Sequence, residues 1–501
     1  MARLLATCAA VALAACATVE RRGPSFVCPA HGGPPWHELT TPSFEVTTDV
    51  QPHRAHELAR ELERMRTAVL AGLFPSAPPE IPTRVRVVVF ASETVYEEFA
   101  PEGLRAYFTR NGLGEDVIVL PAAASQEQRL VLAHELSHHV ARHVFPRQPR
   151  WFGEGLAGSA EALAEPEAEF GRLPRHRRMG FLARRVTVRE LLAWDGRALD
   201  ARWLDSATVL VNYLLHHEAA RLGELQRRLA RAEPPPAIWA EVFPEWDPAR
   251  AGGPEQLDTL LLEHVRARTL PGRQVVPEVH VEKEARLLTP PEVHAVRLSL
   301  PLFARGRDVE AVRAAHRAEV EEALAEDPAH VIALQVKAAL DGLDPLPLAE
   351  RAVAAHPDDV RAWLWLGAAQ RGRVPEAQRL DAFRRAVEVA PASSMAANNL
   401  AWHLLLQGHV PEALPHAERA LRLAPGDPMV LDTYAGVLEA RGDCPAALDV
   451  ANRAVELLPD RATDAQRAPW LERVERLARR CGRASGGAVP ARPPAAPAAS
   501  G

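Results

Sequence analysis

The sequence predicts an α+β domain in the first half of the chain and an all-α solenoid of helical repeats in the second half. Three observations lead to this prediction. Short apolar stretches lie between residues 44 and 120, helical periodicity dominates the segments after them, and prolines recur every thirty-four residues from residue 357 onward. At 501 residues, 47% of them hydrophobic and 25% charged, the chain is too long for one core and has an ordinary globular composition.

Residues 1–16 have the pattern of a bacterial lipoprotein export signal. Arg3 precedes a short apolar run, and small residues lead to Cys16. Acyl chains on Cys16 would hold the protein at a membrane by its lipid anchor only. The alternative is a plain secretory signal in which Cys16 is incidental. Because Ala17 stands where an aspartate retains many lipoproteins in the inner membrane, we expect the outer membrane of the cell envelope, facing the periplasm.

Export also changes the interpretation of the cysteines. Cys8 would leave with the signal and Cys16 would take lipid, so three cysteines remain. An oxidising periplasm would permit a disulfide between Cys444 and Cys481. Two separate buried thiols are the alternative.

The charge distribution does not indicate a nucleic-acid partner. The formal net charge is -6, and Lys and Arg are scattered among acids without a long basic block. Six arginines do cluster between Arg172 and Arg185. They could select an acidic substrate or contact lipid phosphate, but we interpret them as a solvated face.

The elements of the first domain follow a proline- and glycine-rich tether at residues 17–43. Strands are expected at 44–48, 85–90 and 116–120, with helices at 53–73 and 94–99. A small sheet packed on helices makes an α+β unit, which we place at residues 44–265.

The next helix carries the chemically most informative residues. Ser125 and Gln128 fit a capping box, and apolar residues recur at helical spacing until a proline ends the run. On this helix His134 and His138 lie four residues apart, so both rings can reach a single ion, and Glu135 flanks them.

A third metal ligand is available further along the chain, in the segment 151–157. Two neutral imidazoles and the carboxylate of Glu154 would leave zinc with an open fourth position, the condition for binding and acidifying a water. An accidental match on a surface or core helix is the alternative. His139 and His143 repeat the spacing, but no acid lies between them in the equivalent place, so we interpret them as boundary residues.

The two segments HELSH and WFGEGLA resemble the gluzincin metallopeptidases, especially a compact bacterial peptidase-MA-like branch. The resemblance covers about residues 40–265 and implies a zincin-like metallopeptidase domain that binds one Zn²⁺. It implies that the three zinc ligands are His134, His138 and Glu154. It also implies Glu135 as the general base and Glu161 as the acidic residue that supports a ligand histidine.

The same resemblance gives two further expectations. An edge strand before the metal helix would hold a peptide substrate, with residues 117–120 as the candidate and an interior strand as the alternative. A polar group on the helix at 203–217 would stabilise the oxyanion, with packing or surface roles as the alternative; the candidates are Asn212, Tyr213, His216 and His217.

The second half begins with an expected linker at residues 266–301 and continues as tetratricopeptide repeats over 302–483. The best repeats lie at 360–459, where prolines are spaced by thirty-four residues, and degenerate repeats precede them. Stacked helix pairs form a concave surface that usually binds a protein partner, with a structural spacer as the alternative. Residues 484–501 are expected to form a disordered tail.

These pieces together predict a zinc-dependent peptidase, anchored by lipid at the cell envelope. Its substrate would be a peptide or protein, and its repeats would recruit a protein partner. The alternative is a non-catalytic scaffold lipoprotein that uses its repeats and keeps a vestigial zincin domain.

Overall fold

The structure, a computed structural model, describes residues 26–73, 81, 84–100, 106–110, 115–122, 126–164, 169–194, 200–267, 273–274, 285–301, 309–458 and 463–485. The expected export signal with Cys16, the first part of the tether and the tail from residue 486 onward lie outside these residues. Within the described part of the chain, no helix combines the length and apolar character needed to cross a bilayer.

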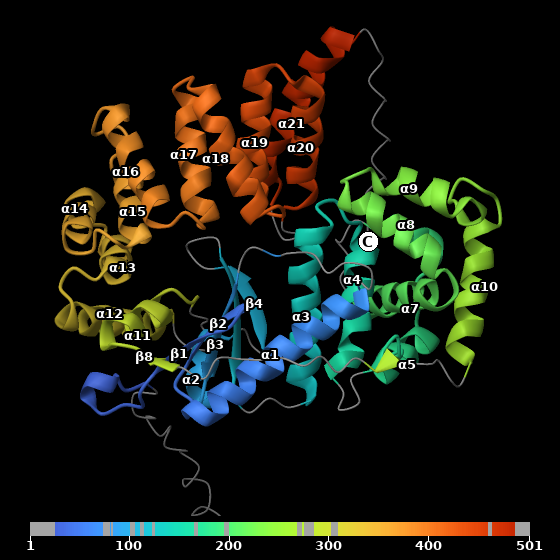
Figure 1. The fold of residues 1–501 in the computed structure, drawn as a ribbon, viewed down its shortest axis with the longest axis horizontal. Coiled ribbons are helices and arrows are strands. Elements are labelled where there is room, and N and C mark those ends of the chain that lie inside the picture. Colours follow the sequence, from blue (N-terminus) through green and yellow to red (C-terminus); the bar gives the residue numbers. More distant parts are fainter. Residues whose placement is uncertain are drawn as a thin grey trace, which may run out of the picture.

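A six-stranded mixed sheet forms the centre of the first domain (Figure 1). Its central strands are parallel and apolar, with Val87 opposite Val46 on one side and Ile118 on the other. The strand order is β4 (Tyr107–Arg110), β5 (Asp116–Pro121), β3 (Val85–Phe90), β2 (Phe44–Thr48), β1 (His37–Thr40) and β8 (Ala285–Leu287).

The three strands expected from the sequence are β2, β3 and β5, and each is confirmed. Two assignments need correction, because β1 lies within the expected tether 17–43, whereas β8 and a helix lie within the expected linker 266–301. Both strands are short, and β8 is mostly exposed, so neither has the apolar alternation that marks a strand in sequence. Pairing with the sheet fixes them instead.

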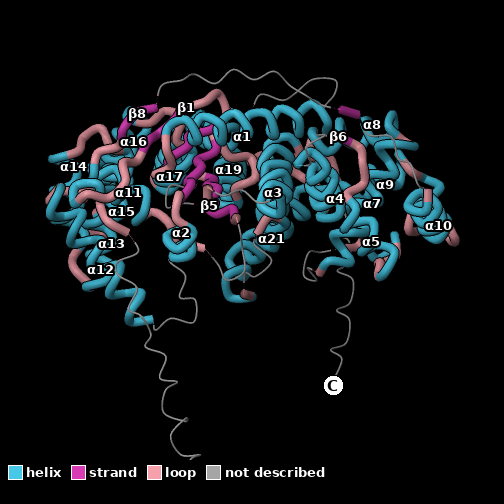
Figure 2. The backbone as a smooth tube through the Cα atoms, turned by 90° about the horizontal axis from the view of Figure 1, so that it is seen from below, coloured by secondary structure: helices cyan, strands magenta, loops and turns pink. Residues whose placement is uncertain are grey.

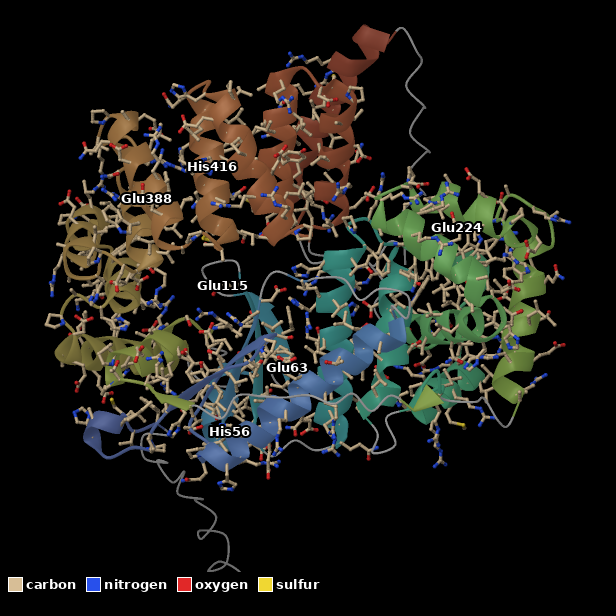
Figure 3. The ribbon with its side chains drawn as sticks, in the orientation of Figure 1. His56, Glu63, Glu115, Glu224, Glu388 and His416 are labelled. Carbon is tan, nitrogen blue, oxygen red and sulfur yellow. The ribbon has the colours of Figure 1, made fainter. Side chains whose placement is uncertain are left out.

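Both faces of the sheet are covered. Because successive side chains of a strand point to opposite faces, Val87 and Val89 pack against α1 (Pro52–Leu73) and α3 (Gln126–Val144), while Val88 packs on the other side with α2 (Glu93–Phe99) and α11 (Pro290–Leu298). The buried carboxylate of Glu63, on α1, accepts hydrogen bonds from the Thr41 hydroxyl at 2.6 Å and the Ser43 amide at 2.7 Å (Figure 3). This fixes the helix on the turn between β1 and β2.

A second, helical core lies beyond α3 and completes the first domain. It is large and rich in tryptophan, phenylalanine and leucine. Its helices are α4 (Arg150–Ala160), α5 (Arg175–Ala183), α6 (Val188–Leu192), α7 (Ala201–His217), α8 (Ala219–Ala230), α9 (Pro235–Val242) and α10 (Gly253–Arg266). A short 3₁₀ segment, η2 (Glu161–Ala164), follows α4, and β6 (Glu169–Phe170) pairs with β7 (Arg273–Gln274).

The second half of the chain is an all-α solenoid of helix pairs, as the thirty-four-residue period predicts (Figure 1). In the described repeats, the residue before each proline of the period has left the helical conformation. Two residues after each proline, a side chain caps the start of the next helix; these caps are Asp359, Ser393 and Asp427. After α11 come α12 (Val309–Glu326), α13 (Val331–Asp341), α14 (Pro345–Ala355), α15 (Val360–Ala369), α16 (Glu376–Val389), α17 (Ser394–Leu406), α18 (Val410–Leu423), α19 (Pro428–Arg441), α20 (Cys444–Glu456) and α21 (Asp464–Ser485).

The solenoid arches from one side of the first domain to the other. It starts beside β8 and β1, and its last pairs lie next to the ends of α3 and α4 (Figure 1). Arg147, just after α3, closes the arch with ion pairs of 3.0 Å to Asp449 and 2.8 Å to Glu456, both on α20. In the view from below, the strands of the main sheet lie together, β6 lies apart from them near α8, and helices make up most of the chain (Figure 2).

Cys444, at the start of α20, is disulfide-bonded. Helix α21 packs against α20 and contains Cys481, whose side chain lies outside the described residues. The pairing of Cys444 with Cys481 therefore stays a prediction.

Candidate metal centre

Helix α3 brings two imidazoles to one point. The Nε2 atoms of His134 and His138 are 3.2 Å apart, and the two rings meet nearly edge to face, with centroids 4.8 Å apart. The spacing of four residues on one helix causes this arrangement. Both side chains are mostly buried, so the pair faces a partly closed site.

Helix α4 supplies the third group. Oε2 of Glu154 lies 3.4 Å from Nε2 of His134 and 3.4 Å from Nε2 of His138, and the Glu154 side chain is only 5% exposed. The three donor atoms therefore form a nearly equilateral triangle. The structure brings together the three residues that the sequence predicts as zinc ligands.

Close packing between α4 and α7 holds Glu154 in place. A Cβ atom on Gly155 would lie 2.4 Å from a methyl of Val211, and one on Gly158 would lie 1.9 Å from the Thr208 hydroxyl. Only glycine lets the two helices approach this closely. Ser159 is buried and donates to the Gly155 carbonyl at 2.8 Å.

Glu161, at the start of η2, fixes the ring of His134. Its Oε1 atom lies 2.9 Å from Nδ1 of His134, which leaves Nε2 facing the other two ligand groups. Arg177 holds the same carboxylate through two hydrogen bonds of 2.6 and 3.0 Å, and it also reaches Asp205 at 3.2 Å. The sequence prediction placed Glu161 in this supporting role.

The charges of the cluster stabilise one another. Burial acts to lower the pKa of His134, but hydrogen bonds that the ring donates to the carboxylates of Glu154 and Glu161 outweigh it and raise that pKa to about 9. Burial acts to raise the pKa of Glu154, but His134 and His138 hold it far below its ordinary value. The proton that His134 holds therefore balances the carboxylate charge beside it.

Glu135 is the next residue on α3 and is partly exposed. Among the residues that the structure describes, none gives its carboxylate a hydrogen bond or ion pair. The group is thus available to a water or substrate beside the two histidines.

The donor set fits a zinc ion. With metal–ligand bonds of about 2.0–2.1 Å, the atoms of a tetrahedral site lie about 3.3 Å apart. The observed separations are 3.2, 3.4 and 3.4 Å. Two imidazoles, one carboxylate and a histidine held by a further carboxylate are what zinc takes in sites with an open position.

The expected substrate strand is interior. Residues 117–120 belong to β5, which pairs with β3 on one side and β4 on the other. The strand at this edge of the sheet is β4, which runs antiparallel to β5 and contacts α3. Strand β4 has only four residues and was not predicted, although Tyr107, Phe108 and Thr109 are residue types that favour strands.

The four oxyanion candidates on α7 have bonded or packed positions. Asn212 is fully buried, donates to the Gly171 carbonyl at 2.8 Å and contacts His264 at 2.9 Å. The His216 ring bonds the same carbonyl at 2.7 Å. His217 contacts His264 at 3.1 Å, and Tyr213 is packed against it, which favours the packing alternative for this group.

Two sequence interpretations are corrected. His139 is buried rather than a boundary residue: its Nδ1 lies 3.0 Å from Asp116, and it lines a cavity of about 330 Å³ between the sheet and the repeat turns. Arg177 is not part of a solvated face, because its side chain is 12% exposed and pairs with Glu161 and Asp205. Since Asp205 lies on another helix, no sequence spacing indicated this pairing.

Sequence reasoning also missed two partners of the ligand groups. Arg150 reaches Oε1 of Glu154 at 3.1 Å, four residues away on the same helix, and this spacing was a usable signal. His176 lies 2.9 Å from Oε2 of Glu161. Arg150 adds positive charge beside the buried carboxylate of Glu154, and His176 adds a hydrogen-bond partner to that of Glu161.

Comparisons with known proteins add little. The sequence matches no family model and no curated protein. One similar solved structure is YrrB, a TPR protein with an unusual peptide-binding site, at 18% identity over 33% of this chain and 85% of that chain, with a TM-score of 0.25. Another is the type IV pilus biogenesis factor PilW, at 18% identity over 38% of this chain and 92% of that chain, with a TM-score of 0.27. Yeast Tom70 is similar at 10% identity over 86% of this chain and 74% of that chain, with a TM-score of 0.32. Likenesses at these scores carry no argument, and the repeat architecture rests on the helix pairs themselves.

Proposed function

We propose that the chain is a zinc-dependent peptidase that hydrolyses bonds in a peptide or protein. The observation that carries the proposal is the triangle of donor atoms from His134, His138 and Glu154, with Glu135 on the same helix. These three side chains would hold the ion. When bound, zinc supplies Lewis-acid polarisation of a carbonyl and acidification of water.

The residues of the chain would then act in defined roles. The Glu135 carboxylate accepts a proton from the attacking water and passes it to the departing amine nitrogen. Glu161 keeps His134 in one tautomer, so the ring always presents Nε2. Strand β4 would offer its backbone to an extended substrate, because a peptide can add to a sheet edge through main-chain hydrogen bonds.

The expected lipoprotein signal supports an envelope location for this peptidase. Residues 1–16 would direct export, and lipid on Cys16 would anchor the mature chain. The arch of repeats would bring a protein partner or substrate to the enzyme domain.

The test combines metal content and turnover in the mature chain. Glu135→Gln should keep stoichiometric zinc and lose at least about 100-fold in rate, since it removes only the base. His138→Ala should lose the zinc. The matched control is Glu224→Gln on α8, whose carboxylate pairs only with its neighbour Arg227 at 2.7 Å on the surface. Wild type without bound zinc at this site, or full turnover by Glu135→Gln, would refute the proposal.

A second candidate function rests on the solenoid. Tetratricopeptide-type helix pairs are a protein-interaction fold, and here they are directly visible, whereas the peptidase chemistry is inferred from four side chains. On that observation, a non-catalytic scaffold that binds a partner through its repeats is supported at least as well. Zinc at His134 without hydrolysis of unfolded proteins or envelope peptides would favour the scaffold.

A further inference from the structure

A second group of metal-binding side chains lies far from the α3 motif in sequence and comes from three separate segments. Cys28 precedes the short 3₁₀ turn η1 (Pro29–His31), His294 lies on α11 and Glu322 lies on α12. One donor atom from each of the three lies within 4.8 Å of the other two. Cys28 and His294 are both fully buried, and the Glu322 side chain is 30% exposed.

His294 has one nitrogen bound and one without a partner. Its Nδ1 lies 2.9 Å from Glu319, which Arg297 holds through hydrogen bonds of 2.8 to 3.0 Å. Its Nε2 is buried and has no hydrogen-bond partner among the described residues. A buried polar atom without a partner destabilises the fold, so a ligand at Nε2 would remove that cost.

The arrangement repeats the one at the α3 site. There, His134 Nδ1 lies 2.9 Å from Glu161, and Arg177 holds that carboxylate. In both places a carboxylate, fixed by an arginine, engages Nδ1, so that Nε2 is the ring nitrogen left for a metal ion. Carboxylates of this kind orient histidines that bind metal.

The Cys28 thiol is held in a fixed turn. The amides of His31 and Gly33 donate to the Cys28 carbonyl at 2.9 and 3.0 Å. The turn also brings His31 to the same place, where its Nδ1 lies 2.8 Å from Oε1 of Glu322. His31 therefore orients the Glu322 carboxylate.

We propose that Cys28, His294 and Glu322 bind one structural zinc ion, with His31 as the residue that positions Glu322. A thiolate, an imidazole and a carboxylate are all zinc ligands, and the two negative charges would neutralise the ion in a buried place. Ligand atoms of a tetrahedral site lie about 3.3–3.8 Å apart, so the group needs to contract by only about 1 Å.

This ion would clamp the N-terminal segment to the base of the solenoid. Its ligands join the described second part of the expected tether, which contains Cys28, with the first two solenoid helices, α11 and α12. Since the ligands are far apart in the sequence, the ion would close long loops and couple metal binding to folding of this junction.

The test is the zinc stoichiometry of the full mature chain and of single variants. Wild type should hold two zinc ions, Cys28→Ser one, His138→Ala one and the double variant none. Glu322→Gln should also lose one ion and serves as a second variant, since this side chain is only partly buried. The control is Glu326→Gln, an exposed carboxylate one turn further along α12.

Cobalt substitution gives a readout independent of activity. Cobalt in His138→Ala should show near-ultraviolet thiolate-to-cobalt absorption, and Cys28→Ser should lack it. Zinc content that Cys28→Ser and Glu322→Gln leave unchanged would overturn this inference while leaving the α3 site intact. If Cys28→Ser and Glu322→Gln lower the zinc content and His138→Ala does not, the result would support this inference and count against the peptidase.

Discussion

The Nδ1 atom of His134 lies 2.9 Å from the carboxylate of Glu161, and Arg177 donates two hydrogen bonds to that same carboxylate. This relationship joins the helix of the candidate metal site to a residue twenty-seven positions further along the chain. It fixes which nitrogen of His134 faces the site before any ion arrives.

Glu161→Gln should therefore weaken zinc binding by about 10- to 100-fold, because the amide keeps the shape but loses the charge that orients and polarises His134. Competition with a fluorescent zinc chelator measures the affinity. Glu224→Gln, on the surface of α8, should leave the affinity unchanged. Equal affinities in Glu161→Gln and wild type would show that the contact has no influence on the metal.

Gly155→Ala should destabilise the first domain by about 1–3 kcal/mol, because the new Cβ would lie 2.4 Å from Val211 in the contact between α4 and α7. Gly223→Ala on α8 is the matched control. Its Cβ would meet only Arg227 at 3.6 Å, so it should be neutral or stabilise by about 0.5–1 kcal/mol. Urea unfolding measures both free energies, and a Gly155→Ala variant as stable as wild type would contradict the packing argument.

Arg147→Ala should weaken the attachment of α20 to the first domain, because it removes both ion pairs between Arg147 and α20. The two acidic partners are 46% exposed, so each pair contributes about 0.2–1 kcal/mol and should weaken in high salt. Amide exchange in α20 should become faster at low salt. Arg385→Ala, which breaks a pair within α16, should not change it.

His264 should make stability depend on pH on the acid side. Burial, and then the nearby His217 and His216, lower its pKa to about 4. The unfolded value is about 6.5, so between these values the unfolded state binds the proton first. The contribution of His264 to the free energy of unfolding is fully present above pH 6.5. It falls by up to about 1.4 kcal/mol per pH unit as the pH drops toward 4.

The check compares unfolding free energies of wild type and His264→Gln between pH 7 and about pH 4. On acidification, the free energy of unfolding of the variant should fall less steeply than that of wild type, by up to about 1.4 kcal/mol per pH unit. His53→Gln, an exposed residue on α1, should keep the wild-type slope. Identical slopes in wild type and His264→Gln would rule out this origin of acid sensitivity.

Much of the fold could be predicted from local pattern. The central strands and the long helices bury whole faces, so their periodicity is visible in sequence, and the turn prolines repeat because each helix pair is the same unit. Strands β1, β4 and β8 could not be predicted in this way. They are three or four residues long and owe their conformation to a neighbour in the sheet.

The sequence by itself determined that His134 and His138 share one face of α3, because residues four apart on a helix carry their geometry in their spacing, and it predicted Glu154 as their partner in a metal site. Only the tertiary structure decided that Arg177 and Asp205 support Glu161, that the repeats close onto Arg147, and that Cys28 meets His294 and Glu322. The physical reason is the same in each case. These groups are brought together by packing between elements, and their separation along the chain has no fixed relation to their distance in space.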